Sequence, residues 1–148
     1  NMQSGAIKLY LTYRALHYRR AREALFRDGN YVPVEIAGSK ADHVCAFLRI
    51  RNHDVALVVA PRLPVALTAG ELHPPVGATV WADTRLILPD DLDIERFGNV
   101  LTGELIPVTM AGKQPTVLVA DVLSVFPVGL CDGGVAAVEA EEDPEEEA

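Results

Sequence analysis

The run HVCAFLRIRNHDVALVVA, residues 43–60, decides the fold class of this chain. Two apolar stretches, 43–50 and 55–60, flank the polar tetrad Arg51-Asn52-His53-Asp54. Both stretches have the length and the apolar composition of strands, and the tetrad has the composition of a short connection. The run therefore predicts a β-hairpin, and Pro61 ends its second strand because proline cannot donate a hydrogen bond to a sheet.

Short strands are also expected on both sides of this hairpin. They cover residues 31–37, 84–88, 100–102, 105–109, 117–119 and 124–131. A loop is expected at 65–78, and residues 120–123 either form one turn of helix or continue a strand. Pro127 predicts that the last strand lies at a sheet edge. About seven or eight short strands with regular turns predict a mainly β fold, an antiparallel β-sandwich.

One long helix is predicted before the sandwich, over residues 5–26. Ser4 is a candidate N-cap, and Asp28-Gly29-Asn30 supplies the stop and the turn. One apolar stripe recurs at helical spacing and consists of Ile7, Leu11, Ala15 and Tyr18. We predict that the chain self-associates through this stripe, because an apolar helix face left uncovered seeks another apolar surface.

The same helix is apolar over more than this stripe. A second set of apolar side chains widens it: Leu9, Tyr10, Tyr13 and Leu16. A helix that is apolar on more than one face is normally buried on more than one side. The sequence therefore predicts a partner for the helix besides the sandwich.

Charge is concentrated at the end of the chain. The net charge is −8, and seven carboxylates lie between residues 139 and 147, so the rest of the chain is close to neutral. We expect residues 133–148 to be a disordered acidic tail, which serves either as an interaction segment or as a solubilising end. A nearly neutral body argues against nucleic-acid binding. No apolar stretch reaches the ~18 residues of a membrane helix.

The two cysteines, Cys45 and Cys131, lie far apart without metal-ligand spacing. Each sits in an apolar run, which predicts buried free thiols and favours a cytoplasmic protein. Asn1 precedes Met2, which indicates the remnant of an expression tag or a piece cut from a longer chain.

No catalytic, metal or cofactor site is predicted. The candidate carboxylates are Asp83, Asp90, Asp91, Asp93 and Glu95. Those after Pro89 read as a polar loop, and Asp83 is expected to pair with Arg85. The histidines, His17, His43, His53 and His73, have no metal-ligand spacing, and neither Ser39 nor Ser124 lies in a Gly-x-Ser-x-Gly motif.

Trp81 is the only tryptophan and has two interpretations. Its flat apolar ring could stack on a sugar, which makes Trp81 the one candidate carbohydrate contact. A single tryptophan is more often a core anchor, through its large buried area.

Seven stretches, in order, resemble the carboxy-terminal region of maltooligosyl trehalose synthases, a family of the α-amylase superfamily. They are IKLYLT (7–12), LFRDGNYVPV (25–34), ADHVCAF (41–47), ALVVAPRL (56–63), WADTRLILP (81–89), NVLTGE (99–104) and ADVLSVFPV (120–128). Any one stretch is weakly specific, but together they span about residues 7 to 130.

The resemblance implies a catalytic (β/α)8 barrel ahead of this region. Such enzymes isomerise the reducing-end α-1,4 linkage of a maltooligosaccharide to α,α-1,1 through an Asp nucleophile and a Glu acid/base. Those motifs are absent here, so the resemblance assigns no catalytic residue and no cofactor to this chain. It further implies that residues 1–30 are the end of the barrel, followed by a sandwich domain at 31–132.

Three functions follow as hypotheses. The first is a structural domain that packs on the barrel of a trehalose-forming enzyme, with completion of the rim of its maltooligosaccharide site as a further role. The second is a stand-alone carbohydrate-binding module. The third, an intact enzyme, predicts trehalose formation from maltopentaose, and we expect no turnover.

Overall fold

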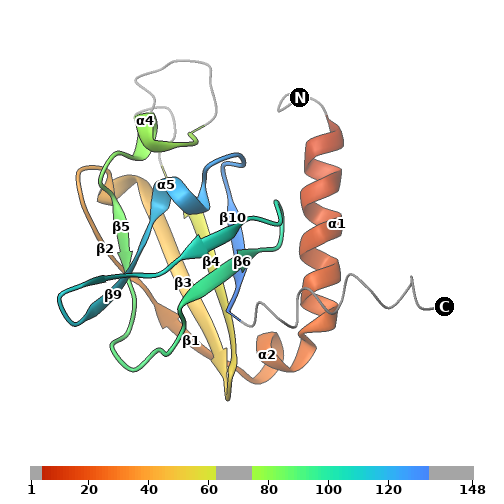
Figure 1. Cartoon of the computed structure of the whole chain (residues 1–148). Coiled ribbons are helices and arrows are strands. Elements are labelled where there is room, and N and C mark those ends of the chain that lie inside the picture. Colours follow the sequence, from red (N-terminus) through yellow and green to blue (C-terminus); the bar gives the residue numbers. More distant parts are fainter. Residues whose placement is uncertain (1–4, 63–74, 134–148) are drawn as a thin grey trace.

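Two antiparallel β-sheets and one long helix beside them make up the structure (Figure 1), a computed structural model that describes residues 5–62 and 75–133. The first sheet has the spatial order β1 (Asn30–Pro33), β3 (Val44–Arg51), β4 (Asp54–Pro61), β10 (Gly129–Asp132), β6 (Arg96–Asn99) and β7 (Leu105–Pro107). The second has the order β2 (Glu35–Ala37), β5 (Arg85–Ile87), β9 (Gln114–Leu118) and β8 (Thr109–Ala111). The helical segments are α1 (Gly5–Ala21), α2 (Glu23–Asp28), η1 (Ala41–His43), α4 (Ala78–Trp81) and α5 (Val119–Val122). The predicted mainly β, two-sheet fold with a helix before it is confirmed.

The hairpin at the centre of the sequence prediction is present as β3 and β4. Arg51 pairs with Asp54 at its turn, and Asn52 has a φ of 56° there. Asparagine tolerates this left-handed conformation better than most residues, so the tetrad suits a tight turn. Along β3, buried side chains alternate with more exposed ones, which points one face of the strand into the core.

The first predicted strand, 31–37, is in fact two strands in different sheets. β1 pairs with β3, whereas β2 pairs with β5. Between them Val34 is buried and donates its N–H to the Ala46 carbonyl oxygen at 3.1 Å. The chain therefore crosses from one sheet to the other at Val34, and this crossing ties the two layers together.

The main core lies between the two sheets. Its fully buried side chains include Trp81, Phe97, Leu48, Leu57 and Leu86. These residues come from both sheets and from α4, so the core joins every layer except α1. Burying a large apolar side chain contributes roughly 1.5–3 kcal/mol, which makes this core the main source of stability.

The prediction for the last strand was wrong in position and in setting. Residues 124–128 lie outside the strand, and β10 covers Gly129–Asp132 between β4 and β6. Pro127 therefore marks no sheet edge. A Cβ on Gly129 would come within 2.3 Å of Val122 Cγ1, so the absence of a side chain lets α5 lie against this central strand.

Other boundaries also differ from the prediction. The strand expected at 100–102 lies earlier, at β6, because the Asn99 side chain accepts the Leu101 N–H at 2.9 Å and starts a turn. The predicted helix over residues 5–26 breaks at Arg22, whose φ of −118° separates α1 from α2. Of the two alternatives for residues 120–123, the turn of helix is the one present, as α5.

Several predictions concern residues outside the described ranges. They are the Ser4 cap, the origin of Asn1, His73, most of the 65–78 loop and the acidic tail beyond residue 133. In the described ranges, no helix combines the length and the apolar character that a membrane span requires.

Candidate docking surface on helix α1

Helix α1 is held to the first sheet by three side chains one helical turn apart. The Tyr10 hydroxyl donates to the Leu101 carbonyl oxygen at 2.7 Å. Arg14 donates through Nε and Nη2 to the Val100 carbonyl oxygen at 3.2 and 2.6 Å. Tyr18, the third, reaches β10. Positions four apart lie on one helix face, so these bonds fix which side of α1 faces the sheet.

The strongest of these attachments is a buried polar cluster at Asp132. The Tyr18 hydroxyl donates to Asp132 Oδ2 at 2.6 Å, and Arg22 Nε lies 3.2 Å from the same oxygen. Burial, with the adjacent carboxylate, raises the pKa of Tyr18 far above its ordinary value. Tyr18 is therefore a neutral hydrogen-bond donor at any physiological pH.

A small second core lies beneath this cluster. It contains Tyr18, Leu25, Ala56 and Val100, with Phe26 and Leu130 packed against it. The rings of Tyr18 and Phe26 meet edge to face, with centroids 5.8 Å apart and an interplanar angle of 81°. The lower end of α1 and the whole of α2 are thus integral parts of the folded unit.

The opposite side of α1 carries three exposed apolar residues, which we call the outer face. They are Leu9, Tyr13 and Leu16, with 73%, 63% and 56% of their surface exposed. Their spacing of four and three places them in one line along the helix. The Tyr13 ring stacks on His17 at 5.9 Å, which adds a flat aromatic surface beside that line.

The stripe proposed for self-association has a different role. Tyr18 is only 3% exposed and Leu11 is half-buried, because both side chains turn toward the sheet. Ala15 is exposed at the border of a groove, and the side chain of Ile7 is outside the description. The prediction that this stripe is an exposed face was wrong for Leu11 and Tyr18, since helical periodicity finds faces without saying which one meets the sheet.

An apolar groove runs between α1 and the first sheet. One wall is the α1 row Leu11, Ala15 and Arg19, and Phe26 lies at its lower end. Its floor is formed by β4 and β10 and the residues next to them, namely Val58, Val59, Ala60, Leu101, Val128, Gly129 and Leu130. The groove has a volume of about 320 Å³. Helix α1 therefore covers only part of the outer surface of the sheet.

Trp81 is a core residue in this structure. Its side chain is fully buried, and its Nε1–H donates to the Pro75 carbonyl oxygen at 2.8 Å. Stacking on a sugar requires an exposed ring face, so a carbohydrate contact through Trp81 would first require the ring to leave the core.

The predicted polar loop is present around Asp90, Asp91, Asp93 and Glu95. It borders a hollow of about 330 Å³ together with Val108 and Met110. Asp90 Oδ1 lies 3.4 Å from Gln114 Nε2. Asp83 does not pair with Arg85 as expected; it accepts hydrogen bonds from the Ser39 N–H and hydroxyl at 3.2 and 2.9 Å, which lower the pKa of its carboxyl.

The remaining candidate residues are scattered. His17 lies on α1, His43 in η1 and His53 in the β3–β4 turn, and Ser124 binds Glu104 Oε1 at 2.8 Å. Across residues 5–62 and 75–133, no group of three or more His, Cys, Asp or Glu side chains could hold a metal ion.

The two cysteines occupy opposite environments. Cys131 is fully buried, and burial raises the pKa of its thiol. Cys45 is exposed, which corrects the prediction of two buried thiols. Its neighbours Val44 and Ala46 point into the core, so strand alternation turns Cys45 outward onto a part of the sheet that α1 does not cover.

Residues that the sequence analysis missed include Arg14 and Asp132. Both make contacts across more than eighty residues of chain, which no local pattern encodes. The only signal for Asp132 is its position as a lone acid directly after an apolar strand.

No protein-family model and no curated protein matches this chain. Among solved structures, it is similar to a noncanonic maltogenic alpha-amylase, AmyB, from Thermotoga neapolitana, with 13% identity and a TM-score of 0.50. The likeness covers 80% of this chain and 23% of that chain. At this identity the likeness concerns the fold alone: this chain is built like a part, about a quarter, of that larger protein.

Proposed function

We propose that this chain is a carboxy-terminal accessory domain of a carbohydrate-active enzyme, and that it packs on a catalytic barrel through α1. The observation that carries this proposal is the outer face, an exposed apolar line on a helix whose other side is already bound to the sheet. A helix with two apolar sides needs two partners, and the sandwich supplies only one.

The energetic argument rests on the size of the exposed side chains. Burying Leu9, Tyr13 and Leu16 against another surface would contribute roughly 1.5–3 kcal/mol for each leucine, with a comparable gain from the tyrosine ring. Contiguous apolar patches on soluble proteins commonly mark interaction sites. The fold likeness supports the same direction, because its matched part belongs to a larger alpha-amylase chain.

At a finer level, we propose maltooligosyl trehalose synthase as the parent enzyme. The support is the ordered set of seven sequence stretches over residues 7–130. In this proposal residues 1–30 are the last helical segment of the barrel and also pack on the accessory domain, residues 31–132. The parent acts in the cytoplasm on maltooligosaccharides. The barrel supplies both catalytic carboxylates, and this chain supplies none.

The coding sequence upstream of Met2 gives the first test. A barrel with two matched catalytic carboxylates is expected there, and its absence would sink the proposal. The second test mixes the separately produced barrel with this chain and measures trehalose-end formation from maltopentaose. Addition of the chain is expected to stabilise the barrel and to raise its activity, whereas the chain alone should show no turnover.

A matched pair of variants locates the contact. Leu16→Glu places a charge on the outer face and should abolish the gain in barrel activity that the chain produces. Leu105→Glu changes a leucine of similar exposure, 50%, on β7, and should leave the gain intact. Equal effects from both variants would exclude docking through α1. Saturable binding of maltoheptaose by this chain alone, measured by calorimetry, would favour the carbohydrate-binding module instead.

A further inference from the structure

The apolar groove beside α1 is distinct from the outer face and could bind a different apolar segment. Its volume of about 320 Å³ corresponds to about ten water molecules at ~30 Å³ each. Water in a groove lined by Val58, Ala60 and Leu130 has few polar partners. Apolar side chains that displaced this water would gain the ordinary free energy of burial.

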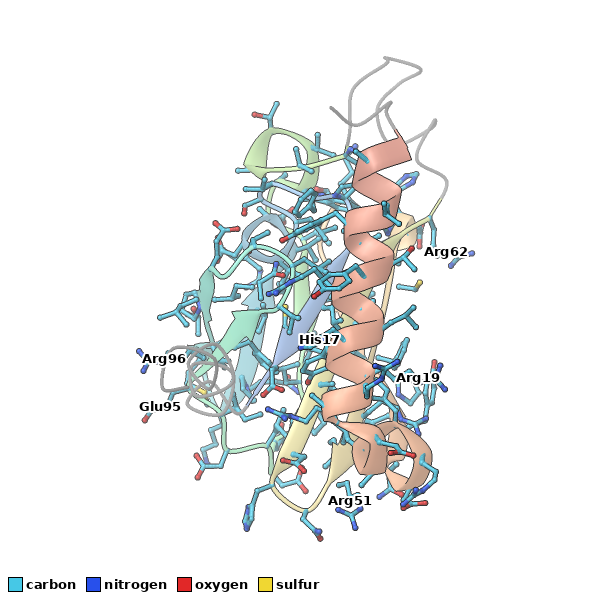
Figure 2. The ribbon with its side chains drawn as sticks, turned by 90° about the vertical axis from the view of Figure 1, so that its right-hand side faces the viewer. His17, Arg19, Arg51, Arg62, Glu95 and Arg96 are labelled. Atoms are coloured by element: carbon cyan, nitrogen blue, oxygen red, sulfur yellow. The ribbon has the colours of Figure 1, made fainter. Side chains whose placement is uncertain are left out.

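The rim of the groove is positively charged. Arg19 lines it, and Arg62 directly follows β4, one of the strands of its floor. Figure 2 places both arginines on the same side of α1. Both are exposed, and neither forms a salt bridge with any residue that the structure describes. A fitting occupant therefore combines apolar side chains with negative charge.

The carboxy-terminal segment of this chain has that composition. Two valines and two alanines at 135–138 come first, and seven carboxylates follow between 139 and 147. The segment starts after Asp132, which Tyr18 and Arg22 hold against the lower part of α1. It therefore leaves the sheet below the lower end of the groove, where Phe26 lies.

The register of the sheet sets the direction in which the segment would run. Asp132 pairs with Ala56 and Gly129 with Val59, so β4 leads from the start of the segment toward Arg62. Because Arg19 directly follows Tyr18, a segment that turned back along the groove would meet Arg19 near its start, then Val58, and Arg62 last. Fifteen residues reach roughly 50 Å when extended at ~3.3 Å each, which is ample for α1 at ~1.5 Å per residue.

We propose that residues 134–148 dock in this groove, with the apolar quartet over the lower part of its floor and the acidic run along its basic rim toward Arg62. Each exposed ion pair contributes only ~0–1 kcal/mol. The segment is covalently attached to the domain, so its effective concentration at the groove is in the mM range. This compensates for the small free energy of each ion pair. Docking is therefore intramolecular, weak and sensitive to salt.

A spin label tests the contact directly. The label is attached to Ala140→Cys in a Cys45→Ser background, where the remaining thiol, Cys131, is buried. At about 20 mM salt we expect paramagnetic broadening of the amide signals of Ala15, Arg19 and residues 58–60. At about 0.5 M salt, where the screening length is only a few Å, these signals should recover.

Charge reversal supplies the matched comparison. Arg19→Glu together with Arg62→Glu should remove the broadening at low salt. Arg96→Glu changes an exposed arginine on β6, away from the groove in Figure 2, and should leave the broadening unchanged. Broadening that is absent from the groove, or that survives the double reversal, would overturn the proposal.

Two further measurements complete the test. In a mixture of spin-labelled chains with separate ¹⁵N-labelled chains, broadening of the ¹⁵N signals would assign the groove to a second copy and overturn the proposal. A chain ended after Gly133 needs no labelling and keeps Cys45. It should bind more of the apolar dye ANS than the full chain does, and equal dye binding would also overturn the proposal.

Discussion

The Tyr18 hydroxyl donates a 2.6 Å hydrogen bond to Asp132 Oδ2 and thereby joins the first helix to the last strand of the described chain. Asp132 is 3% exposed, so its carboxylate requires donors within the protein. Arg22 supplies a second contact to the same oxygen at 3.2 Å. The position of α1 on the sheet therefore depends on a charged group inside the protein.

Tyr18→Phe is expected to destabilise the protein by about 1–3 kcal/mol, because the buried carboxylate loses a donor while the ring remains. Urea unfolding followed by circular dichroism measures this change. Tyr13→Phe removes a hydroxyl from an exposed ring on the same helix and should change the free energy of unfolding by less than about 0.5 kcal/mol. Similar losses from both variants would contradict the role given to Tyr18.

Stability is expected to fall in alkaline solution. Tyr18 and Cys131 both have a raised pKa in the folded state, so the folded protein retains protons that the unfolded chain releases above the ordinary values of 10.0 and 9.0. Their contribution is complete below pH 9 and is lost as the pH rises. The slope reaches up to about 1.4 kcal/mol per pH unit for each group.

Urea unfolding between about pH 8 and pH 11 measures this slope. The loss should begin near pH 9, where the unfolded thiol titrates, and steepen near pH 10. In Tyr18→Phe the steeper part should disappear while the part from Cys131 persists. A free energy of unfolding that stayed level through this range would rule out the burial of both groups.

The outer face is predicted to contribute little to the stability of this chain. Leu9→Gln with Leu16→Gln should change the free energy of unfolding by less than about 1 kcal/mol, because both side chains are exposed in the folded state. Leu25→Ala, beneath the same helix pair, should cost about 2–5 kcal/mol. Chemical denaturation of the two variants side by side checks the contrast. A large loss from the outer pair would mean that these leucines pack against this chain.

Trp81 is the only tryptophan and reports on the core. Its native emission should be blue-shifted and poorly quenched by iodide, because its ring is fully buried. In denaturant, quenching should rise to the level of a free tryptophan derivative. Maltoheptaose should leave the native emission unchanged. A sugar-dependent change, or strong quenching in the folded protein, would support the interpretation of Trp81 as a carbohydrate contact.

The cysteines should differ in reactivity. In the folded protein DTNB is expected to modify the exposed Cys45 and to spare the buried Cys131. Denaturant should then release the second thiol. Cys45→Ser should abolish the native reaction, whereas rapid native modification in that variant would show that β10 is open to solvent.

The parts of the fold that the sequence predicted are those with local signals. The β3–β4 hairpin follows from two apolar runs and one polar tetrad, and the helical start of the chain was equally readable. The α5 turn was one of two alternatives that the sequence left open. The last strand was misplaced because Pro127 reads as an edge residue, while the central position of β10 depends on pairing with strands distant in sequence.

The faces of α1 could not be assigned for the same kind of reason. Its hydrophobic pattern contains both an inward and an outward set, and tyrosines occur in each. Tyr10 and Tyr18 turn inward because Leu101 and Asp132 offer them acceptors. Those acceptors lie 91 and 114 residues away, so only the folded arrangement of the sheet decides the choice.

The central place of β10 has a consequence for synthesis on the ribosome. β4 and β6 are adjacent to β10 and not to each other, so the first sheet remains in two halves until residues 129–132 have been made. Nascent chains emerge at roughly 5–20 residues per second. For several seconds the β1–β3–β4 half of the sheet and α1 therefore lack β10, the strand that carries Asp132. A chain arrested on the ribosome shortly before Gly129 should be readily digested by protease.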